Sequence, residues 1–589
     1  MTHVKLCKLF KICIVLISIG GLRAAADDGE YTKVCDKLKL KGALSPPLHE
    51  IEKRLVCGEG DQSKSEAWRA IPSTQAELTL RSFLKDRGYY YPDVRIQDGV
   101  FSVSVGDPTL VKATKIQGEV ENLELVQDRG VIGRPLTPKL LRSLNKWVTN
   151  RLQSLGYACA FATSEGDPGT GTVKITIQSG QKLNLLRETE YQEHDLNPSA
   201  LHRFDAFEFN KPFNKDLVSL TESRLIKDGL VQSVQLISHC DENGVILSQE
   251  ALTGPPRMLR LGVGVSTESL FILKATWKNS RLDKNGSSIS FSGYASAIDQ
   301  SLNATYNWYP WEEAPRLGIK PMAQFVHVLR NSYEYYLSEG QIGPFWTEDA
   351  LDQSFLINMG PDIQYFQELA GVGPDTSHFF NLKTMITAMS HDFEYYMKSP
   401  RTGYSTAVTL ILNNQALASS ATAEKLKVDG KYLLNFKNYD PPLFILGLRG
   451  GVATTLTNQQ FGTHIGLPPP YLSFLGGSTT IRGYNLDELP ESQIGGLADY
   501  YLGTELSFGS LAWNFNIGPL PQTIVPFLFA DVGGIGNESF QIDSPVYWSP
   551  GIGARWASLI GPIRFTVARG YPSDTPGHFQ FFFSLGEEF

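Results

Sequence analysis

The sequence has few charged residues, few cysteines and no long apolar run beyond its N-terminal segment. Charged side chains make up 19% of the 589 residues and the formal net charge is −8, so no basic surface of the kind that binds nucleic acid is expected. After the N-terminal segment no run reaches the roughly eighteen apolar residues that a membrane-spanning helix needs. No pair among the six cysteines has the spacing of a zinc site.

Sequence motifs of catalysis are missing as well. The chain has no His-Glu-x-x-His, no Gly-x-Ser-x-Gly and no phosphate-loop lysine pattern. The run Gly371-Val372-Gly373-Pro374 is rich in glycine but lacks the rest of a nucleotide-binding pattern, and the histidines are scattered. We therefore expect no enzyme, no cofactor and no metal site.

Aromatic residues and glycine are abundant instead. The 32 Phe, 24 Tyr, 9 Trp and 54 Gly are typical of a β protein with many turns and a large apolar surface. The first residues have the pattern of a secretory signal: Lys5, Lys8 and Lys11 precede an apolar run over 12–19, and Ala24-Ala25-Ala26 fits a small-residue cleavage site. We expect residues 1–26 to be a signal peptide, because the apolar run is too short for a helical membrane anchor.

The remaining cysteines are Cys35, Cys57, Cys159 and Cys240, which allow three full pairings. Cys35 and Cys57 are closest in sequence and flank a loop-like segment. We therefore predict a disulfide between these two in an oxidising compartment. The other two cysteines are expected to be thiols that fill a core.

A weak repeat runs through residues 27–256. Helix-like segments end at Gly88, Gly156 and Gly229, each followed by an apolar or aromatic residue and then by strands with period-two alternation. The interval of about 70 to 75 residues predicts three small modules, each a helix pair on a mixed sheet, at 27–107, 108–182 and 183–256. Their exposed sheet edges suit the pairing of an extended client strand, and the alternative is that the modules act only as spacers.

Residues 257–589 have the alternation of a transmembrane β-barrel. Leu259, Leu261 and Val263 alternate with polar or small residues, Asn285-Gly286 marks a tight turn, and later strands repeat the pattern with aromatic ends. At about 20 residues per strand and connection, the region accommodates about 16 antiparallel strands. The alternative fold is a soluble β-sandwich, which the secretory signal and the strongly apolar last strand disfavour.

The most distinctive local sequence is the run from Gly476 to Tyr484, which contains a single cation, Arg482. On its own this run is typical of a surface loop with turn residues. Its surroundings favour a different interpretation, because other short motifs follow it in a fixed order. They are Gly503-Thr504-Glu505, Phe529-Ala530-Asp531-Val532-Gly533, Gly551-Ile552-Gly553-Ala554-Arg555, Gly561-Pro562-Ile563-Arg564 and an aromatic last strand ending at Phe589.

This set resembles the outer-membrane assembly and two-partner-secretion barrels, the superfamily of BamA and TamA. Arg482-Gly483-Tyr484 after Gly476-Gly477 resembles its loop-six motif. The resemblance implies three polypeptide-transport-associated (POTRA) domains ahead of the barrel, and a loop that folds back into the lumen with Arg482 against the inner wall. We call residues 476–484 the latch segment.

A buried guanidinium needs a carboxylate that matches its planar fork. Asp531, between Phe529 and Gly533, is the partner that we expect, with Glu505 as the second carboxylate. A chain of this length with three POTRA domains ahead of one barrel resembles the TamA-like assembly factors. That resemblance implies a bacterial outer-membrane location with the POTRA domains in the periplasm, a TamB-like partner anchored in the inner membrane, and unfolded outer-membrane or autotransporter proteins as clients.

The predicted function is therefore protein insertion and assembly without covalent catalysis. The first and last strands must pair to close the barrel, and glycines in both would weaken that seam. A weak seam could open laterally and template a client strand. The alternative function is a two-partner-secretion-type or passive transport channel. The seam residues that we expect are Leu259, Leu261, Gly262, Gly264, Phe581, Phe583, Gly586 and Phe589.

Overall fold

The computed structural model describes residues 31–57, 73–118, 130–191, 196–371, 373–397, 401–436, 440, 442–458, 467–490, 494–509, 524–558, 561–572 and 579–586. The predicted signal peptide and Phe589 lie outside these residues. The chain divides into two compact units, Met1–Lys182 and Leu183–Phe589. No helix within the described ranges is long and apolar enough to cross a membrane.

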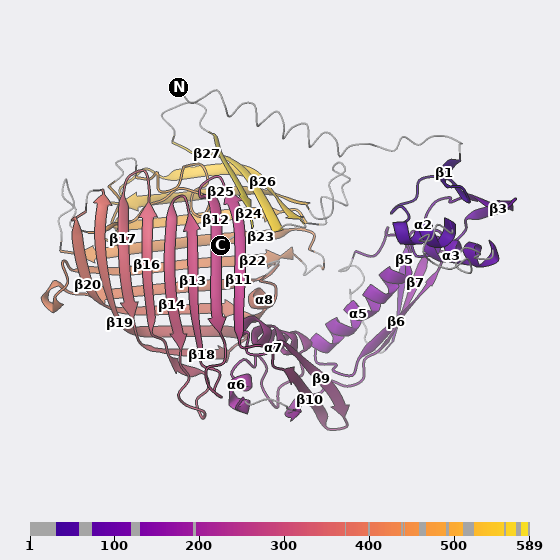
Figure 1. The fold of residues 1–589 in the computed structure, drawn as a ribbon, viewed down its shortest axis with the longest axis horizontal. Coiled ribbons are helices and arrows are strands. Elements are labelled where there is room, and N and C mark those ends of the chain that lie inside the picture. Colours follow the sequence, from indigo (N-terminus) through magenta and orange to yellow (C-terminus); the bar gives the residue numbers. More distant parts are fainter. Residues whose placement is uncertain are drawn as a thin grey trace, which may run out of the picture. The chain divides into compact units, whose positions relative to one another are not determined.

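The first unit contains two small mixed sheets (Figure 1). The first has the order β1-β2-β4-β3, and the second has the order β5-β7-β6. Their elements are β1 (Thr32–Cys35), β2 (Leu38–Lys41), α2 (Glu50–Cys57), α3 (Ser73–Lys85), β3 (Asp93–Gln97), β4 (Val100–Ser104), β5 (Ala113–Gly118), α5 (Pro138–Ser154), β6 (Phe161–Asp167) and β7 (Thr172–Gln178).

A third sheet of the same kind opens the second unit, with the order β8-β10-β9. Its elements are β8 (Leu185–Tyr191), α6 (Pro198–His202), α7 (Lys215–Asp228), β9 (Ser233–Asp241) and β10 (Gly244–Leu252). Each of the three sheets combines one parallel pair (β2–β4, β5–β7, β8–β10) with an antiparallel hairpin (β3–β4, β6–β7, β9–β10), and the first sheet has a further antiparallel pair, β1–β2. The repeat in the sequence therefore corresponds to a repeated topology.

The glycines that marked the repeat follow the ends of helices. Gly88, Gly156 and Gly229 have φ values of 91°, 101° and 82°, in the left-handed region that glycine adopts without steric cost. Thr137 caps α5 by accepting a hydrogen bond from the Leu140 N–H, and Asn214 caps α7 in the same way. Local sequence signals thus set both ends of these helices.

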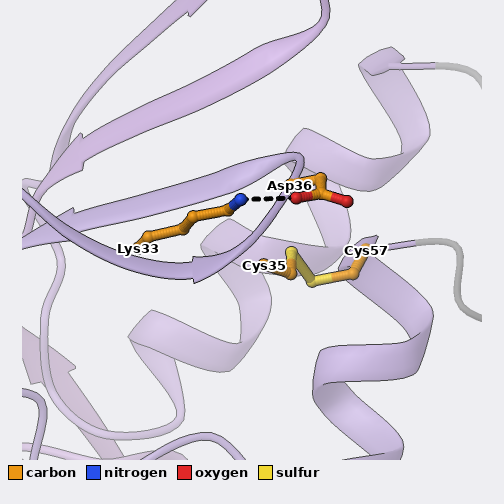
Figure 2. The surroundings of a disulfide bond; sticks show 4 residues. All are labelled: Lys33, Cys35, Asp36 and Cys57. Carbon is orange, nitrogen blue, oxygen red and sulfur yellow. Dashed lines mark ion pairs between the residues drawn. A yellow bond between two sulfur atoms is a disulfide. The ribbon is translucent and has the colours of Figure 1, made fainter.

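A disulfide joins Cys35 at the end of β1 to Cys57 at the end of α2, with Cα atoms 6.3 Å apart (Figure 2). The Lys33–Asp36 ion pair lies beside it, at 2.6 Å. Cys159 and Cys240 are both exposed, and neither is a free thiol. This corrects their assignment as core thiols: small modules with limited cores often use cysteines as cross-links.

The rest of the second unit is a closed barrel of sixteen antiparallel strands (Figure 1). Its strands are β11 (Arg257–Ser266), β12 (Leu270–Asn279), β13 (Ser288–Ser296), β14 (Asp299–Asn307), β16 (Met322–Leu329), β17 (Glu334–Gln341), β19 (Gln353–Ala370), β20 (Thr376–Ser390), β21 (Gly403–Asn413), β22 (Ala423–Asn435), β23 (Ile445–Thr457), β24 (Ala498–Ser507), β25 (Ile524–Gly536), β26 (Tyr547–Ser558), β27 (Gly561–Arg569) and β28 (Phe579–Leu585).

Two short strands, β15 (Leu317–Ile319) and β18 (Pro344–Ala350), pair with each other, and β18 also pairs with the first part of β19, over residues 353–358. β14 pairs directly with β16, and β17 pairs with the later part of β19, over residues 362–370. A short helix α8 (His391–Tyr395) follows β20, and two 3₁₀ turns, η2 (Gln415–Leu417) and η4 (Pro469–Tyr471), lie in other connections. The third sheet with α7 lies at the α8 end of the barrel (Figure 1).

Candidate functional site

The described part of the connection between β23 and β24, residues 467–490 and 494–497, lies inside the barrel. Tyr471 in this connection is 1% exposed, its ring lies 4.6 Å from that of Phe379, and its hydroxyl donates to Gln364 at 3.1 Å. Gln364 and Phe379 are buried while their sequence neighbours Ile363, Tyr365 and Phe380 are exposed, so these strands present Gln364 and Phe379 to the lumen. The connection therefore fills part of the lumen instead of lying on the outer surface.

Arg482 of the latch segment binds two carboxylates and lies against one aromatic ring of the barrel wall. Its side chain is 1% exposed, and that of Asp531 on β25 is 0% exposed. The Arg482 Nε donates to Asp531 Oδ2 and Nη2 donates to Oδ1, both at 2.8 Å, while the backbone N–H of Arg482 also donates to Oδ2 at 3.1 Å. The Arg482 Nη1 donates to Glu505 Oε2 on β24 at 3.0 Å, and the guanidinium lies 3.5 Å from the ring centre of Phe529.

This geometry gives the guanidinium the partners that burial demands. The bidentate contact with Asp531 fits the planar fork of arginine, and the aromatic face of Phe529 covers the flat side of the same group. The structure thus brings Arg482, Asp531, Glu505 and Phe529 together.

Three further arginines surround these two carboxylates, and sequence reasoning did not single out their part in the site. Arg555 on β26 lies 2.5 Å from Glu505 Oε1, and Arg564 on β27 lies 3.2 Å from Glu505 Oε2. Arg449 on β23 lies 3.3 Å from Asp531 and donates to the carbonyl oxygens of Ser478 and Thr480 at 3.0 and 2.9 Å. Arg449 therefore binds both the wall and the latch segment.

Glycines allow the latch segment to approach the wall. A Cβ on Gly483 would lie 2.4 Å from the backbone N of Gly570, and a Cβ on Gly476 would lie 2.1 Å from the Asn485 carbonyl oxygen. Gly476 and Gly477 also have positive φ, at 119° and 91°. Gly533 is the wall's counterpart, since a Cβ there would lie 2.8 Å from Ile481 Cδ1. A side chain at Gly483 or Gly533 would push the segment away from the wall, and one at Gly476 would clash within the loop itself.

Tyr484 fixes the end of the latch segment to the connection after β27. Its hydroxyl donates to the Pro572 carbonyl oxygen at 3.0 Å, and its ring meets Tyr547 edge to face with centres 5.6 Å apart. Both rings belong to a buried cluster with Leu475, Ile481 and Leu489. The latch segment is therefore held by apolar packing as well as by charge.

Among the described residues, the seam between β11 and β28 is short. Its register pairs are Val265 with Leu585 and Ser266 with Ser584, and the Thr267 N–H donates to the Phe583 carbonyl oxygen at 2.9 Å. By contrast, β11 pairs with β12 along its whole length from Arg257 to Ser266.

The predicted seam residues are distributed unevenly around this contact. Gly264 and Gly586 are adjacent, because a Cβ on Gly586 would lie 3.4 Å from the Gly264 Cα. Phe581 and Phe583 pair with β27. Among the described residues, Leu259, Leu261 and Gly262 have no partner on β28, and the first two are exposed on the outer face.

The third module is attached to the barrel through Arg224 of α7, which sequence reasoning also missed. Its guanidinium binds Asp349 at 2.8 and 3.0 Å and Glu394 at 2.7 and 3.0 Å. Burial alone would lower the pKa of Arg224, but the hydrogen bonds to the two carboxylates raise it above its ordinary value. The Arg224 guanidinium therefore stays positively charged at any physiological pH.

One group of side chains in the third module has the atom types of a metal site. Ligand atoms of Glu188, His202 and Asp205 lie within 4.8 Å of one another. His202 Nδ1 lies 3.0 Å from Asp205 Oδ2 and 3.7 Å from Glu188 Oε2, so the imidazole lies beside both carboxylates. We assign no metal to them.

Comparison with known proteins identifies the barrel. Residues 259–589 match the model of the Omp85 superfamily domain. Among solved structures, BamA from Haemophilus ducreyi lacking POTRA domains 1–3 matches at 16% identity and a TM-score of 0.49, covering 82% of this chain and 100% of that one. CdiB from Escherichia coli matches at 13% identity and a TM-score of 0.45, covering 87% of this chain and 97% of that one. At these values the structural matches do not bear on clients or partners.

Proposed function

The chain belongs to the Omp85 superfamily, and from this premise we propose that it is an outer-membrane assembly factor that inserts client β-strands at the β11–β28 seam. The observation that carries the proposal is the short pairing of this seam, which among the described residues has two register pairs, against ten between β11 and β12. A short seam is the easiest place for a closed barrel to open.

The free edge of β11 has a chemical consequence in a membrane. Among the described residues, those from Arg257 to Gly264 pair only with β12. Backbone N–H and C=O groups that face hydrocarbon without partners cost several kcal/mol each. An extended client strand would satisfy them by adding to the sheet edge, and its hydrogen bonds would be exchanged for those of the seam.

The three N-terminal modules would deliver clients to this edge. We assign them as POTRA domains in the periplasm, since each has a small mixed sheet with an exposed edge. Within the superfamily, three such modules favour a TamA-like role with a TamB-like inner-membrane partner and with outer-membrane or autotransporter proteins as clients.

A reversible cross-link of the seam tests the proposal. Ser266→Cys with Ser584→Cys places cysteines at a register pair of the seam, and Thr276→Cys with Ser292→Cys does the same in the fully paired β12–β13 hairpin as a control. Full-length protein in liposomes is oxidised and supplied with an unfolded outer-membrane protein. We expect the seam cross-link to abolish client assembly, reduction to restore it, and the control to assemble clients in both states.

Unimpaired assembly with a fully cross-linked seam would overturn the proposal. Reduction also opens native disulfides such as Cys35–Cys57, so the control pair must be reduced in parallel.

A secretion or passive channel is the competing function, and conductance separates it. Because the β23–β24 connection occupies the lumen through Tyr471 and Arg482, we expect little steady conductance in planar bilayers. A large steady conductance of the unaltered protein would favour the channel.

A further inference from the structure

The latch segment contacts both connections that flank the seam. On one side, Ser478 donates from its backbone N–H at 2.9 Å and from its hydroxyl at 2.5 Å to the two carboxylate oxygens of Glu268. Glu268 lies in the turn between β11 and β12. On the other side, the Tyr484 hydroxyl donates to the Pro572 carbonyl oxygen, shortly after the end of β27. Seven residues therefore link the two sides of the seam.

The Glu268 contact fits closely. A Cβ on Gly477 would lie 2.7 Å from Glu268 Oε1, so a larger residue there would displace the carboxylate. Ser478 is itself held, because its carbonyl oxygen accepts a hydrogen bond from Arg449 at 3.0 Å. Arg482, four residues further on, is bound to Asp531. Glu268 thus binds a part of the loop that is fixed to the barrel wall.

Glu268 lies directly beyond the last residues of β11 that pair with β28. The register pairs of the seam involve Val265 and Ser266, and the Thr267 N–H provides a further hydrogen bond, so Glu268 follows them directly. Hydrogen bonds to a carboxylate are roughly twice as strong as those between neutral groups. Two of them next to a short seam add a substantial share of what keeps that end closed.

The opposite end of β11 is attached to the third module instead. The Arg260 side chain donates to the Lys227 carbonyl oxygen at 3.1 Å, and a Cβ on Gly229 would lie 2.4 Å from the Met258 side chain. The part of β11 that has no β28 partner among the described residues therefore begins beside the C-terminal end of α7, and the part next to Glu268 lies at the far end of the strand.

We propose that Glu268 and Ser478 form a clasp that holds the turn end of β11, so that the seam opens from its Arg257 end. The proposal rests on the function above, because it specifies how the same seam is controlled. A client strand arriving from the third module would then pair first with the free edge of β11, and release of the clasp would be the last step of opening. Glu268 is a positioning residue, since it acts on the seam through Ser478.

Hydrogen exchange of the intact protein in liposomes, without client, tests the clasp. The Thr267 N–H bonds to Phe583, and the Phe583 N–H donates to the Thr267 hydroxyl at 3.2 Å, so both amides report on opening of the seam. In Glu268→Ala we expect these amides to exchange about tenfold faster, the effect of losing charge-assisted hydrogen bonds. Ser478→Ala should change them in the same direction, and the double variant should exceed the larger single effect only slightly.

Asp543→Ala is the matched control, because Asp543 also accepts hydrogen bonds in a connection between strands, from Asn537 at 2.8 and 3.1 Å, away from the seam. Folding of each variant is checked by the heat-dependent gel migration of the barrel. If Glu268→Ala does not fold, Glu268→Gln, which keeps one acceptor oxygen, and Ser478→Ala replace it.

Unchanged exchange in folded Glu268 and Ser478 variants would overturn the clasp, even if the oxidised seam blocks client assembly. Faster exchange in a protein whose unaltered form assembles no client would support the clasp and refute the assembly function. The two proposals can therefore fail separately.

Discussion

Replacing Arg482 should destabilise the barrel more than breaking an exposed ion pair does. The Arg482→Ala variant leaves the Asp531 carboxylate buried, with its side chain 0% exposed. Breaking a buried pair by removing one partner typically costs about 3–5 kcal/mol. Arg449, 3.3 Å from Asp531, remains as a partial partner, so we expect a loss near the lower end of that range, about 3 kcal/mol of the free energy of unfolding.

The double variant measures how much of each loss depends on the contact between Arg482 and Asp531. Asp531→Ala leaves Arg482 with Glu505 at 3.0 Å and with the Phe529 ring, and we expect a loss of similar size. If the two residues act as one unit, Arg482→Ala with Asp531→Ala should cost little more than the worse single variant, which gives a coupling of about 2–3 kcal/mol.

Urea unfolding in short-chain lipid vesicles, followed by tryptophan fluorescence, measures these differences. Arg401→Ala is the control, because Arg401 pairs with Asp440 at 2.6 Å while both side chains are 28% exposed. Such a pair is worth at most about 1 kcal/mol. Losses that simply add in the double variant would refute the idea that Arg482 is held chiefly through Asp531.

Three further changes test other parts of the structure. Cys35→Ser removes a disulfide that links residues 22 positions apart, and we expect about 3 kcal/mol less stability in the first module, measured by pulse proteolysis of the full chain. Arg224→Ala should make the third module more sensitive to protease. Burial raises the pKa of Glu394 but the Arg224 hydrogen bonds lower it overall, so the protection is present at neutral pH and is lost as the pH falls through the lowered pKa. In Gly483→Ala the Cβ would lie 2.4 Å from the Gly570 backbone N, and we expect a loss of about 1–3 kcal/mol in the same urea assay, with an unchanged midpoint arguing against close packing there.

The family resemblance implied that Arg482 lies against the inner wall, and a buried guanidinium there needs a carboxylate, so Asp531 in the neighbouring motif was the expected partner. Arg449 was within reach of the same reasoning: it stands among Gly447, Gly450 and Gly451, and a long cationic side chain between glycines on one strand indicates a close neighbour. It was missed because its partners lie on other strands and on the loop. Local patterning does not show which strands become neighbours.

The seam shows a second limit. Alternation placed the right strands at the two ends of the barrel, but β11 pairs with β28 through Val265 and Ser266, while Leu259 and Leu261 have no β28 partner among the described residues. The stagger between strands of a barrel is set by closure of the whole ring, so it cannot be derived from either strand alone. Glu268 gave no signal at all, since an acid in a tight turn is ordinary and its partner is 210 positions away.

The two strands of the seam are far apart in the sequence, and this distance affects how the barrel closes when the protein folds. The contact between Phe583 and Thr267 joins residues 316 positions apart, and such contacts form late because the entropy of closing a long loop must be overcome first. Until that moment the chain is an open sheet with two unpaired edges and an apolar outer face, the state most prone to aggregation. During its own biogenesis the protein therefore needs the kind of help that we propose it gives to others.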